Sequence, residues 1–278
     1  MHVMGIVNVT PDSFSDGGLW KEAHAAIAHG RELVEQGADI LDIGGESTRP
    51  GATMIDSSQE WERIHDVVKA LVASVYPEVP LSVDTYHAST ARLAAEAGAS
   101  IINDVTGGQG DPEMFATVAE LGCDYILQHG RGNPQTMNSL EHYEQHVAVE
   151  VHDELLRSRD AAVAAGIAPE RIILDPGLGF AKTGDHDWDA IAGIELIMHE
   201  GHRVLVGASR KRFISELSKP IGAEGPDRDV ATAVISGLLS DMGVWSVRVH
   251  NAAASVVAIG VHEQLKSAQA RWQAAQNA

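Results

Sequence analysis

Eight short apolar runs recur along the chain, and each of them ends at a polar side chain of a kind that takes part in chemistry. The residues at these ends are Asn8, Glu46, Asp84, Asn103 with Asp104, Gln128 with His129, Asp175, Ser209, and Arg248 with His250. Stretches with an apolar helical face lie between the runs, as at Ala23, Ile27 and Val34. Eight strands that alternate with helices predict an α/β fold, a (β/α)8 TIM barrel with its active site at the C-terminal ends of the strands.

A glycine separates several of the helical stretches from the run that follows. These glycines are Gly37, Gly98, Gly122, Gly166, Gly201 and Gly243. A glycine just past a helix adopts the left-handed conformation that ends it, so we expect short, similar turns at the lower face of the barrel. The helices are expected near residues 58–76, 88–97, 112–121, 141–165, 187–199, 228–242 and 252–275. The length is typical of one barrel and no linker interrupts the pattern, so residues 1–278 are expected to form a single domain.

Composition narrows the range of partners. The formal net charge of -19 argues against a nucleic acid, because such partners are recognised by basic surfaces. The single cysteine, Cys123, leaves no intrachain disulfide and is expected to be a small buried residue. The sequence has neither an apolar run long enough for a membrane span nor a signal peptide. We therefore expect a cytoplasmic protein that acts on small molecules.

Cations cluster after the last two runs, in spite of the acidic excess. Ser209 is followed by Arg210, Lys211 and Arg212, while Arg248 and His250 lie two residues apart and so on one side of a strand. Loops after the seventh and eighth strands commonly bind phosphate in this fold. The pattern predicts a phosphate or pyrophosphate site. The alternative is a solvated basic helix start beside a packed histidine.

Acidic and amide side chains end the third, fourth and sixth runs, at Asp84, Asn103 and Asp175. Such groups suit a flat heterocycle with many hydrogen-bonding edges, because a carboxylate can accept two parallel N–H bonds. Alternatively, each could anchor a loop. Asn8, at the end of the first run, is a candidate ligand for Mg²⁺, which takes few protein ligands when it is bound to substrate phosphates. The alternative for Asn8 is a residue that forms the turn before Pro11.

Two long loops lie on the same predicted face. Residues 10–19 and 44–57 are rich in Gly, Pro, Ser and Asp and are candidate lids, unless they are idle surface loops. The sequence has no zinc-binding His-Glu-x-x-His motif and no dinucleotide fingerprint, so neither a structural metal nor NAD is expected.

Longer segments carry a family resemblance. Met4–Gly18 resembles the first signature of dihydropteroate synthases, and Ile43–Ala52 resembles the second. Five shorter motifs follow in the family's order: Ser82–Thr85, Ile102–Asp104, Asp175–Phe180, Ser209–Lys211 and Arg248–His250. The resemblance covers essentially the whole chain. It implies a transferase of folate biosynthesis that joins 6-hydroxymethyl-7,8-dihydropterin diphosphate to p-aminobenzoate, giving 7,8-dihydropteroate and pyrophosphate, and that is the target of sulfonamides.

The resemblance also implies a role for each matching residue. The implied pterin-binding residues are Asp84, Asn103, Asp175 and Lys211. The implied pyrophosphate-binding residues are Asn8, Arg49, Arg248 and His250, with Asn8 also contacting Mg²⁺ as the cofactor. The implied p-aminobenzoate pocket comprises Thr48, Arg49, Pro50, Phe180 and Lys211. The implied catalytic residues are Asp12, Asp84 and Lys211. In the implied dissociative mechanism, Asp12 and Asp84 stabilise a pterin carbocation. Members of this family are usually homodimers, so a homodimer is expected.

The chain departs from the family pattern at two places. Asn251 stands where many members have Asp after the last His, and Arg212 stands where many have Ser after the Lys. Two other functions are alternatives to the synthase. A methyltetrahydrofolate:corrinoid methyltransferase needs neither the Ser47–Gly51 loop nor the cations that follow the last two apolar runs. A catalytically silent pterin-binding paralogue is disfavoured because both signature loops are intact.

Overall fold

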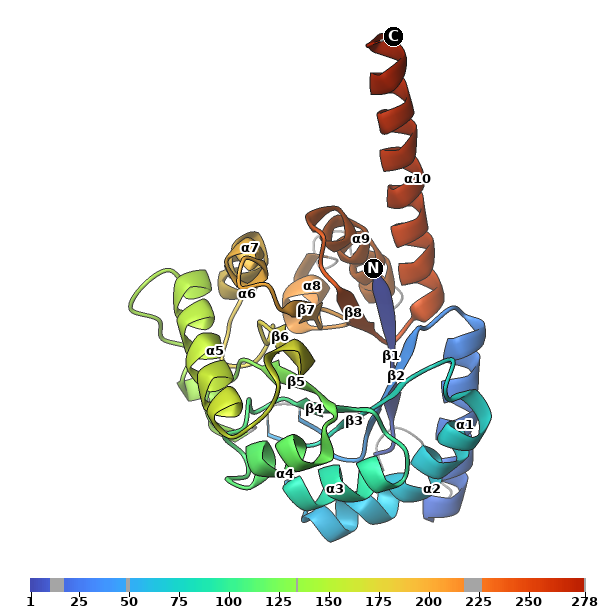
Figure 1. The fold of residues 1–278 in the computed structure, drawn as a ribbon, viewed down its shortest axis with the longest axis vertical. Helices are drawn as coiled ribbons and strands as arrows, with labels where there is room; N and C mark the ends of the chain where they lie inside the picture. The colour runs from blue at the N-terminus through green and yellow to red at the C-terminus, as the bar shows by residue number, and fades with distance from the viewer. Residues whose placement is uncertain (11–17, 49–50, 134, 218–226, 278) are drawn as a thin grey trace.

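The computed structural model describes residues 1–10, 18–48, 51–133, 135–217 and 227–277. In this part of the chain eight parallel strands pair in sequential order and close into a barrel, β1 to β8, with helices around the outside (Figure 1). The barrel closes where β1 pairs with β8, with Val3 opposite Val247 and Met4 opposite Arg248. The predicted (β/α)8 barrel is confirmed.

The strands coincide with the apolar runs. They are β1 His2–Asn8, β2 Ile40–Gly44, β3 Leu81–Asp84, β4 Ile101–Asp104, β5 Asp124–Gln128, β6 Ile172–Asp175, β7 Arg203–Val206 and β8 Ser246–Val249. The helices are α1 Gly18–Glu35, α2 Ser57–Val75, α3 Ala88–Glu96, α4 Met114–Leu121, α5 Val147–Ala164, α6 Asp185–Ala192, α7 Ile194–Met198, α8 Arg212–Ser215, α9 Asp227–Met242 and α10 Ala252–Gln276.

Two helices differ from the sequence pattern. The helix expected over 141–165 begins at Val147, where the ring of His146 accepts a hydrogen bond from the Ala148 backbone N–H. The helix expected over 187–199 is divided at Gly193 into α6 and α7. A Cβ at Gly193 would lie 2.4 Å from the Cβ of Ala148, so the close approach of α5 requires glycine there. The six glycines expected to end helices all have positive φ, including +64° at Gly122.

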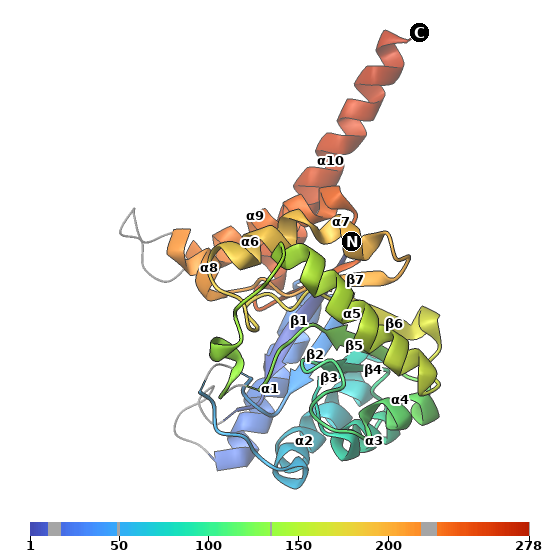
Figure 2. The same cartoon turned by 90° about the vertical axis from the view of Figure 1, so that its left-hand side faces the viewer.

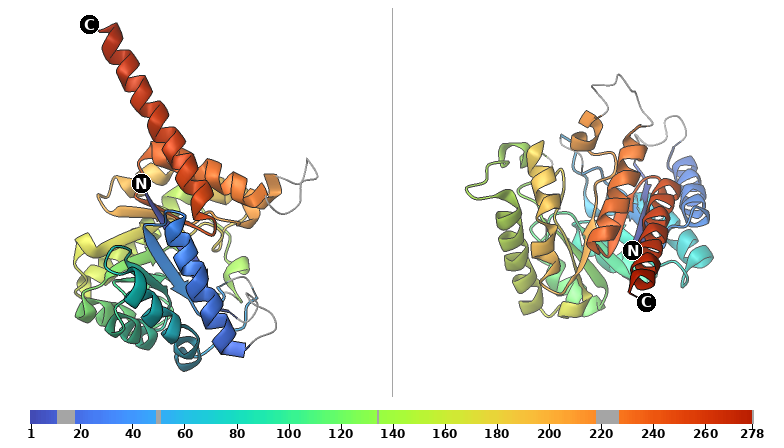
Figure 3. Two further views of the ribbon diagram at one scale, coloured as in Figure 1. Left: turned by 90° about the vertical axis from the view of Figure 1, so that its right-hand side faces the viewer. Right: turned by 90° about the horizontal axis from the view of Figure 1, so that it is seen from above.

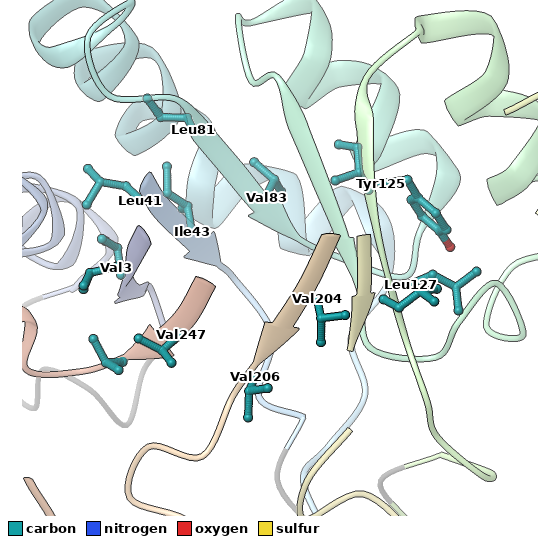
Figure 4. Packing of buried hydrophobic residues seen from close by; sticks show 14 of the residues in the cluster. Val3, Leu41, Ile43, Leu81, Val83, Tyr125, Leu127, Val204, Val206 and Val247 are labelled. Atoms are coloured by element: carbon teal, nitrogen blue, oxygen red, sulfur yellow. The ribbon is translucent and has the colours of Figure 1, made fainter. Parts of the chain in front are cut away.

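Two separate hydrophobic clusters stabilise the barrel. The larger lies between the strands and the helices, and Figure 4 shows some of its members, such as Leu41, Val83 and Leu127. The smaller consists of alternate strand residues and fills the barrel interior; its members are Met4, Ile40, Ile101, Ile126, Ile173 and Leu205. Full burial of one such aliphatic side chain contributes roughly 1.5–3 kcal/mol. Because side chains alternate along a strand, the residues two positions further on also point inward, at the mouth of the barrel.

The C-terminal helix extends beyond the barrel. α10 packs against α9 near its start, and its second half projects away from the remaining elements (Figures 2 and 3). Within the described residues, every helix is too short or too polar to cross a membrane. Cys123, as expected, is buried, and its sulfur lies 3.9 Å from the backbone oxygen of Ala99.

Candidate active site

Four polar side chains from four strands meet inside the C-terminal mouth of the barrel. Arg248 on β8 donates from Nε to Oδ2 of Asp42 at 2.5 Å and from Nη2 to Oδ2 of Asp84 at 2.7 Å. Asn103 on β4 donates from Nδ2 to the same oxygen of Asp42 at 3.1 Å. The structure therefore brings together Asp84, Asn103 and Arg248, which the sequence had placed at three separate strand ends.

Burial controls the charges in this network. It raises the pKa of Asp84 to about 7, an effect that Arg248 opposes and Asp42 reinforces. Burial also works against the charge of Arg248, but Asp42 and Asp84 beside it hold its pKa above the ordinary value. The guanidinium thus stays charged, whereas Asp84 can change its protonation state near neutral pH.

Asp42 is a site residue that the sequence reasoning missed. It is completely buried and accepts two hydrogen bonds through Oδ2, while its other oxygen has no hydrogen-bond partner within the described part of the chain. A signal was present in the sequence: Asp42 follows the interior residue Ile40 by two positions, just as Asn103 follows Ile101. A carboxylate in mid-strand, in phase with interior residues, predicts an inward-facing charge.

Lys211 and Asp175 lie on the other side of the mouth. A Cβ built at Gly207 would lie 3.8 Å from both Asp175 Oδ2 and Lys211 Nζ, so a glycine leaves room for both groups. Burial lowers the pKa of Lys211 to about 8, opposed by Asp175, and it raises the pKa of Asp175, opposed by Lys211. The Lys211 ammonium donates to the Leu178 backbone oxygen and lies 4.9 Å from the ring centroid of Phe180.

Asn8 reaches the same region from the end of β1. A Cβ at Gly44 would lie 3.9 Å from Asn8 Oδ1 and 3.8 Å from Asp84 Oδ2. The absence of a side chain at Gly44 thus leaves a space flanked by two oxygens, a neutral one and a carboxylate one. The Asp84 oxygen already accepts from Arg248, so Asn8 Oδ1 is the oxygen here that fits the magnesium ion implied by the family resemblance.

The basic run after β7 separates into different roles. Ser209 Oγ lies 3.0 Å from Nδ1 of His250 and accepts the His250 backbone N–H at 3.2 Å, which ties the ends of β7 and β8 together. Arg210 has a left-handed φ of +57° and forms two hydrogen bonds with Asp229, at 2.7 and 2.8 Å. The helix that follows, α8, has only four residues. Lys211, rather than Arg210 or a helix end, thus supplies a cation to the mouth.

The departure at Asn251 has a structural explanation. Its Oδ1 accepts the Ala254 backbone N–H at 3.1 Å, which caps α10. Its Nδ2 donates to Oδ2 of Asp229 at 3.3 Å, and the same carboxylate holds Arg210. An Asp at position 251 would place a second carboxylate against Asp229, so the amide suits this environment.

The remaining predicted residues divide into two groups. Thr48 and Phe180 line one cavity at the mouth, together with Tyr86, Arg131 and Met137. The predicted residues Asp12, Arg49 and Pro50 lie outside the described residues.

Some of the polar residues that end the apolar runs hold loops in place. Glu46 Oε1 accepts the hydroxyl of Tyr86 at 2.6 Å, and Asp104 accepts that of Tyr125 at 2.7 Å. Asp104 also accepts the Gly108 backbone N–H at 2.9 Å, so it shapes the turn after β4. For these two residues the loop-anchoring role accounts for the polar strand end.

The fold and the mouth define a class of barrel enzyme, one with buried acceptors for a hydrogen-bonding heterocycle next to cations that suit an anion. Comparison with known proteins narrows the class. Residues 4–250 match the family described as "Pterin binding enzyme". The dihydropteroate synthase of Mycobacterium leprae is 46% identical over 270 residues, covering 94% of this chain and 92% of that protein.

Solved structures agree with this relationship. The Xanthomonas albilineans dihydropteroate synthase with 4-aminobenzoic acid has a TM-score of 0.87 and 42% identity, covering 95% of this chain and 93% of that one. A structure of that enzyme in complex with 7,8-dihydropteroate has a TM-score of 0.83 and 39% identity, with the same coverage. This chain therefore belongs to the pterin-binding enzyme family, in the branch of the dihydropteroate synthases, as its motifs predicted.

Proposed function

We propose that this chain condenses 6-hydroxymethyl-7,8-dihydropterin diphosphate with p-aminobenzoate to give 7,8-dihydropteroate and pyrophosphate. The observation that carries the proposal is the convergence of Asp84, Asn103, Asp175 and Lys211 at one end of the barrel, beside Arg248. The relatives described above carry the name of this activity, and neither a corrinoid methyltransferase nor a silent paralogue is favoured by them.

The hydrogen-bond acceptors that point into the mouth of the barrel suit a pterin. Asp84 and Asp175 are buried carboxylates, and Asn103 offers an amide oxygen that has no hydrogen-bond partner within the described residues. An aminopyrimidine edge presents parallel N–H donors that a carboxylate can accept in pairs. Lys211 supplies a donor on the opposite side. On binding, the pterin ring would thus exchange its hydrogen bonds with water for hydrogen bonds with protein groups that are already in place, which favours binding.

The cations suit the diphosphate. Arg248 has five N–H donors, of which Asp42 and Asp84 occupy only part, and His250 is tied to Ser209 at the neighbouring strand end. Asn8 would hold the Mg²⁺ ion. The ion would neutralise negative charge on the departing pyrophosphate. Arg248 and His250 would hold that pyrophosphate in the orientation needed for departure.

The C–O bond of the pterin substrate would break before the arylamine attacks. The Asp84 carboxylate then stabilises the positive charge that develops on the pterin, and p-aminobenzoate attacks as a neutral nucleophile, so that no strong base is required. The arylamine would lie beside Phe180 and Thr48, and Lys211 would contact both substrates. The cavity measures about 20 Å³ in this structure, so it would have to widen to admit the arylamine, for which a sulfonamide of similar shape would compete.

Pyrophosphate release tests the proposal directly. Purified protein is incubated with dihydropterin diphosphate and Mg²⁺, with and without p-aminobenzoate. Release that depends on the arylamine and yields dihydropteroate is the expected result. Lys211→Ala should weaken binding of both substrates, whereas Lys69→Ala, on the exposed face of α2, should change neither. Tight pterin diphosphate binding without turnover would instead indicate the silent paralogue.

A homodimer is also proposed, through the outer faces of α9 and α10. Exposed apolar residues recur on both helices: Val230, Val234 and Leu238 on α9, and Val257, Val261, Leu265 and Trp272 on α10. Residues four positions apart lie on one face of a helix, so each helix presents a row of exposed apolar side chains, and exposed apolar patches mark interaction sites. The projecting end of α10, where Trp272 is 65% exposed, could reach the same helices of a second copy about a two-fold axis.

Sedimentation at micromolar concentration tests the dimer. Val261→Asp should shift the protein toward monomer, because it places a charge among the exposed apolar residues of α10. Leu93→Asp alters a comparably apolar but less exposed residue on α3 and should leave the mass unchanged. A wild-type monomer would contradict the proposal.

A further inference from the structure

A buried lysine lies behind the candidate active site. Lys182, in the segment after β6, is only 3% exposed. Its ammonium donates to the backbone oxygens of Gly177 at 3.0 Å and Phe180 at 3.2 Å, and lies 2.8 Å from Nδ1 of His129. Burial lowers the pKa of Lys182 to about 7, and in the protonated form its three N–H donors match these three acceptors. Lys182 thus links two carbonyls of one turn to a neighbouring strand end.

The turn that Lys182 holds has an unusual backbone. Its φ angles are positive at Gly177, Gly179 and Ala181, with +49° at the alanine, a region that non-glycine residues rarely adopt. Such a conformation persists only where surrounding contacts over-determine it. The hydrogen bonds from Lys182 to the carbonyls of Gly177 and Phe180 supply two of these contacts.

The same turn makes the contacts of Lys211. The Leu178 backbone oxygen accepts from the Lys211 ammonium, and the Phe180 ring lies beneath it. Gly179 packs against the Lys211 side chain, since a Cβ there would lie 3.1 Å from its Cδ. The positions of Lys211 and of the Phe180 ring therefore depend on the shape of the turn.

The hydrogen bonds continue from Lys182 to another residue that lines the cavity. Burial, together with Lys182, lowers the pKa of His129 to about 4, so the ring is neutral and its Nδ1 can accept from Lys182. Its Nε2 then donates to Glu154 at 2.9 Å. Glu154 also accepts from Arg131 at 2.6 and 3.0 Å, and Arg131 lines the same cavity as Phe180. One chain of hydrogen bonds thus runs from the turn to a second residue that lines the cavity.

We propose that Lys182 is a positioning residue for the arylamine, which fixes the 177–182 turn so that Phe180 and Lys211 form one side of the p-aminobenzoate pocket. This inference rests on the proposed function for the identity of the ligand. Asp84 and Asn103, which face the pterin, belong to a different hydrogen-bond network, whereas Asp175 accepts the Gly177 backbone N–H of this turn at 2.7 Å. The Phe180 ring is carried by the turn itself and would face the arylamine alone. Loss of Lys182 should therefore affect the arylamine more than the pterin, whose other two residues lie outside the turn.

Lys182→Met tests this role, because it keeps the length of the side chain and removes the donors. Affinities for p-aminobenzoate and for dihydropterin diphosphate are measured by equilibrium binding as well as from KM. We expect affinity for the arylamine to fall roughly tenfold or more, the effect of losing a hydrogen bond to a charged group, while affinity for the pterin changes less than about threefold. Equal changes for both substrates, or none, would overturn the inference.

Controls separate positioning from general stability. Ile259→Ala removes a buried side chain in α10 and should lower Tm without changing the ratio of the two affinities. If Lys182→Met does not fold, His129→Leu removes one of the three acceptors and should shift the ratio in the same direction by a smaller factor. An unchanged ratio of the two affinities in His129→Leu would also overturn the positioning role of Lys182. Wild-type turnover tests the proposed function separately, since the binding ratio does not require turnover.

Discussion

Asp42→Asn removes one charge from the buried network and keeps the shape of the side chain. Asp42 is fully buried, and its Oδ2 accepts hydrogen bonds from Arg248 at 2.5 Å and from Asn103 at 3.1 Å. The substitution leaves the Arg248 guanidinium with Asp84 as its remaining carboxylate partner in the hydrogen-bond network. We expect both lower stability and lower activity.

The magnitude follows from the geometry. Two unit charges about 4 Å apart attract each other by about 4 kcal/mol at an effective dielectric constant near 20. Part of this is offset, because the neutral amide costs less to bury and its oxygen can still accept from Arg248. The free energy of unfolding should therefore fall by about 2 kcal/mol. For a domain of this size, that loss lowers Tm by about 3–4 °C.

Urea unfolding and thermal melting measure the loss of stability, and dihydropteroate formation measures activity. Turnover should fall by roughly tenfold, because Arg248 and Asn103 lose a shared anchor. Asp39→Asn is the matched control: Asp39 is half exposed and accepts the Val3 backbone N–H at 2.8 Å, a bond that Asn can also accept. Wild-type stability and turnover in Asp42→Asn would refute the reasoning.

Three further predictions follow from the same geometry. Gly44→Ala puts a methyl group 3.8 Å from Asp84 Oδ2, which is an ordinary contact, so Tm should stay nearly constant. Turnover should fall because the methyl group fills the space between Asn8 and Asp84, and full activity would show that this space has no role. The kcat/KM for pterin diphosphate should be bell-shaped, because Asp84 gains a proton as the pH falls below about 7 and Lys211 loses one as it rises above about 8; a flat profile would contradict these roles. Asn251→Asp should cost about 1 kcal/mol through repulsion from Asp229, and adding Asp229→Asn should recover much of it in a double-mutant cycle; additive effects would argue against the contact.

The barrel could be predicted because its signals are local. Each strand coincides with an apolar run, and the helix-ending glycines adopt the positive φ that their positions indicate. One helix boundary that differed from the prediction depended on a residue far along the chain. Gly193 divides a helix because α5 approaches it closely, and no local pattern around residue 193 reveals that contact.

The candidate site was predicted in part. Asp84, Asn103, Asp175, Lys211 and Arg248 do converge, because parallel strands in a barrel bring their C-terminal ends to one face. Which groups pair with one another did not follow from the motifs. Arg210 lies within the same basic run as Lys211, yet it turns away to Asp229. Its left-handed backbone and the position of α9 determine that direction.

The sequence by itself determined the order of the strands, the polar residues at their ends and the family, because period and motif are local properties. The tertiary structure decided that Asp42 and Arg248, 206 positions apart, share a hydrogen bond. It also decided that Lys182 is buried against His129 instead of reaching solvent. Closure of β1 against β8 and the packing of the turn after β6 create these pairs, and burial then sets their charges.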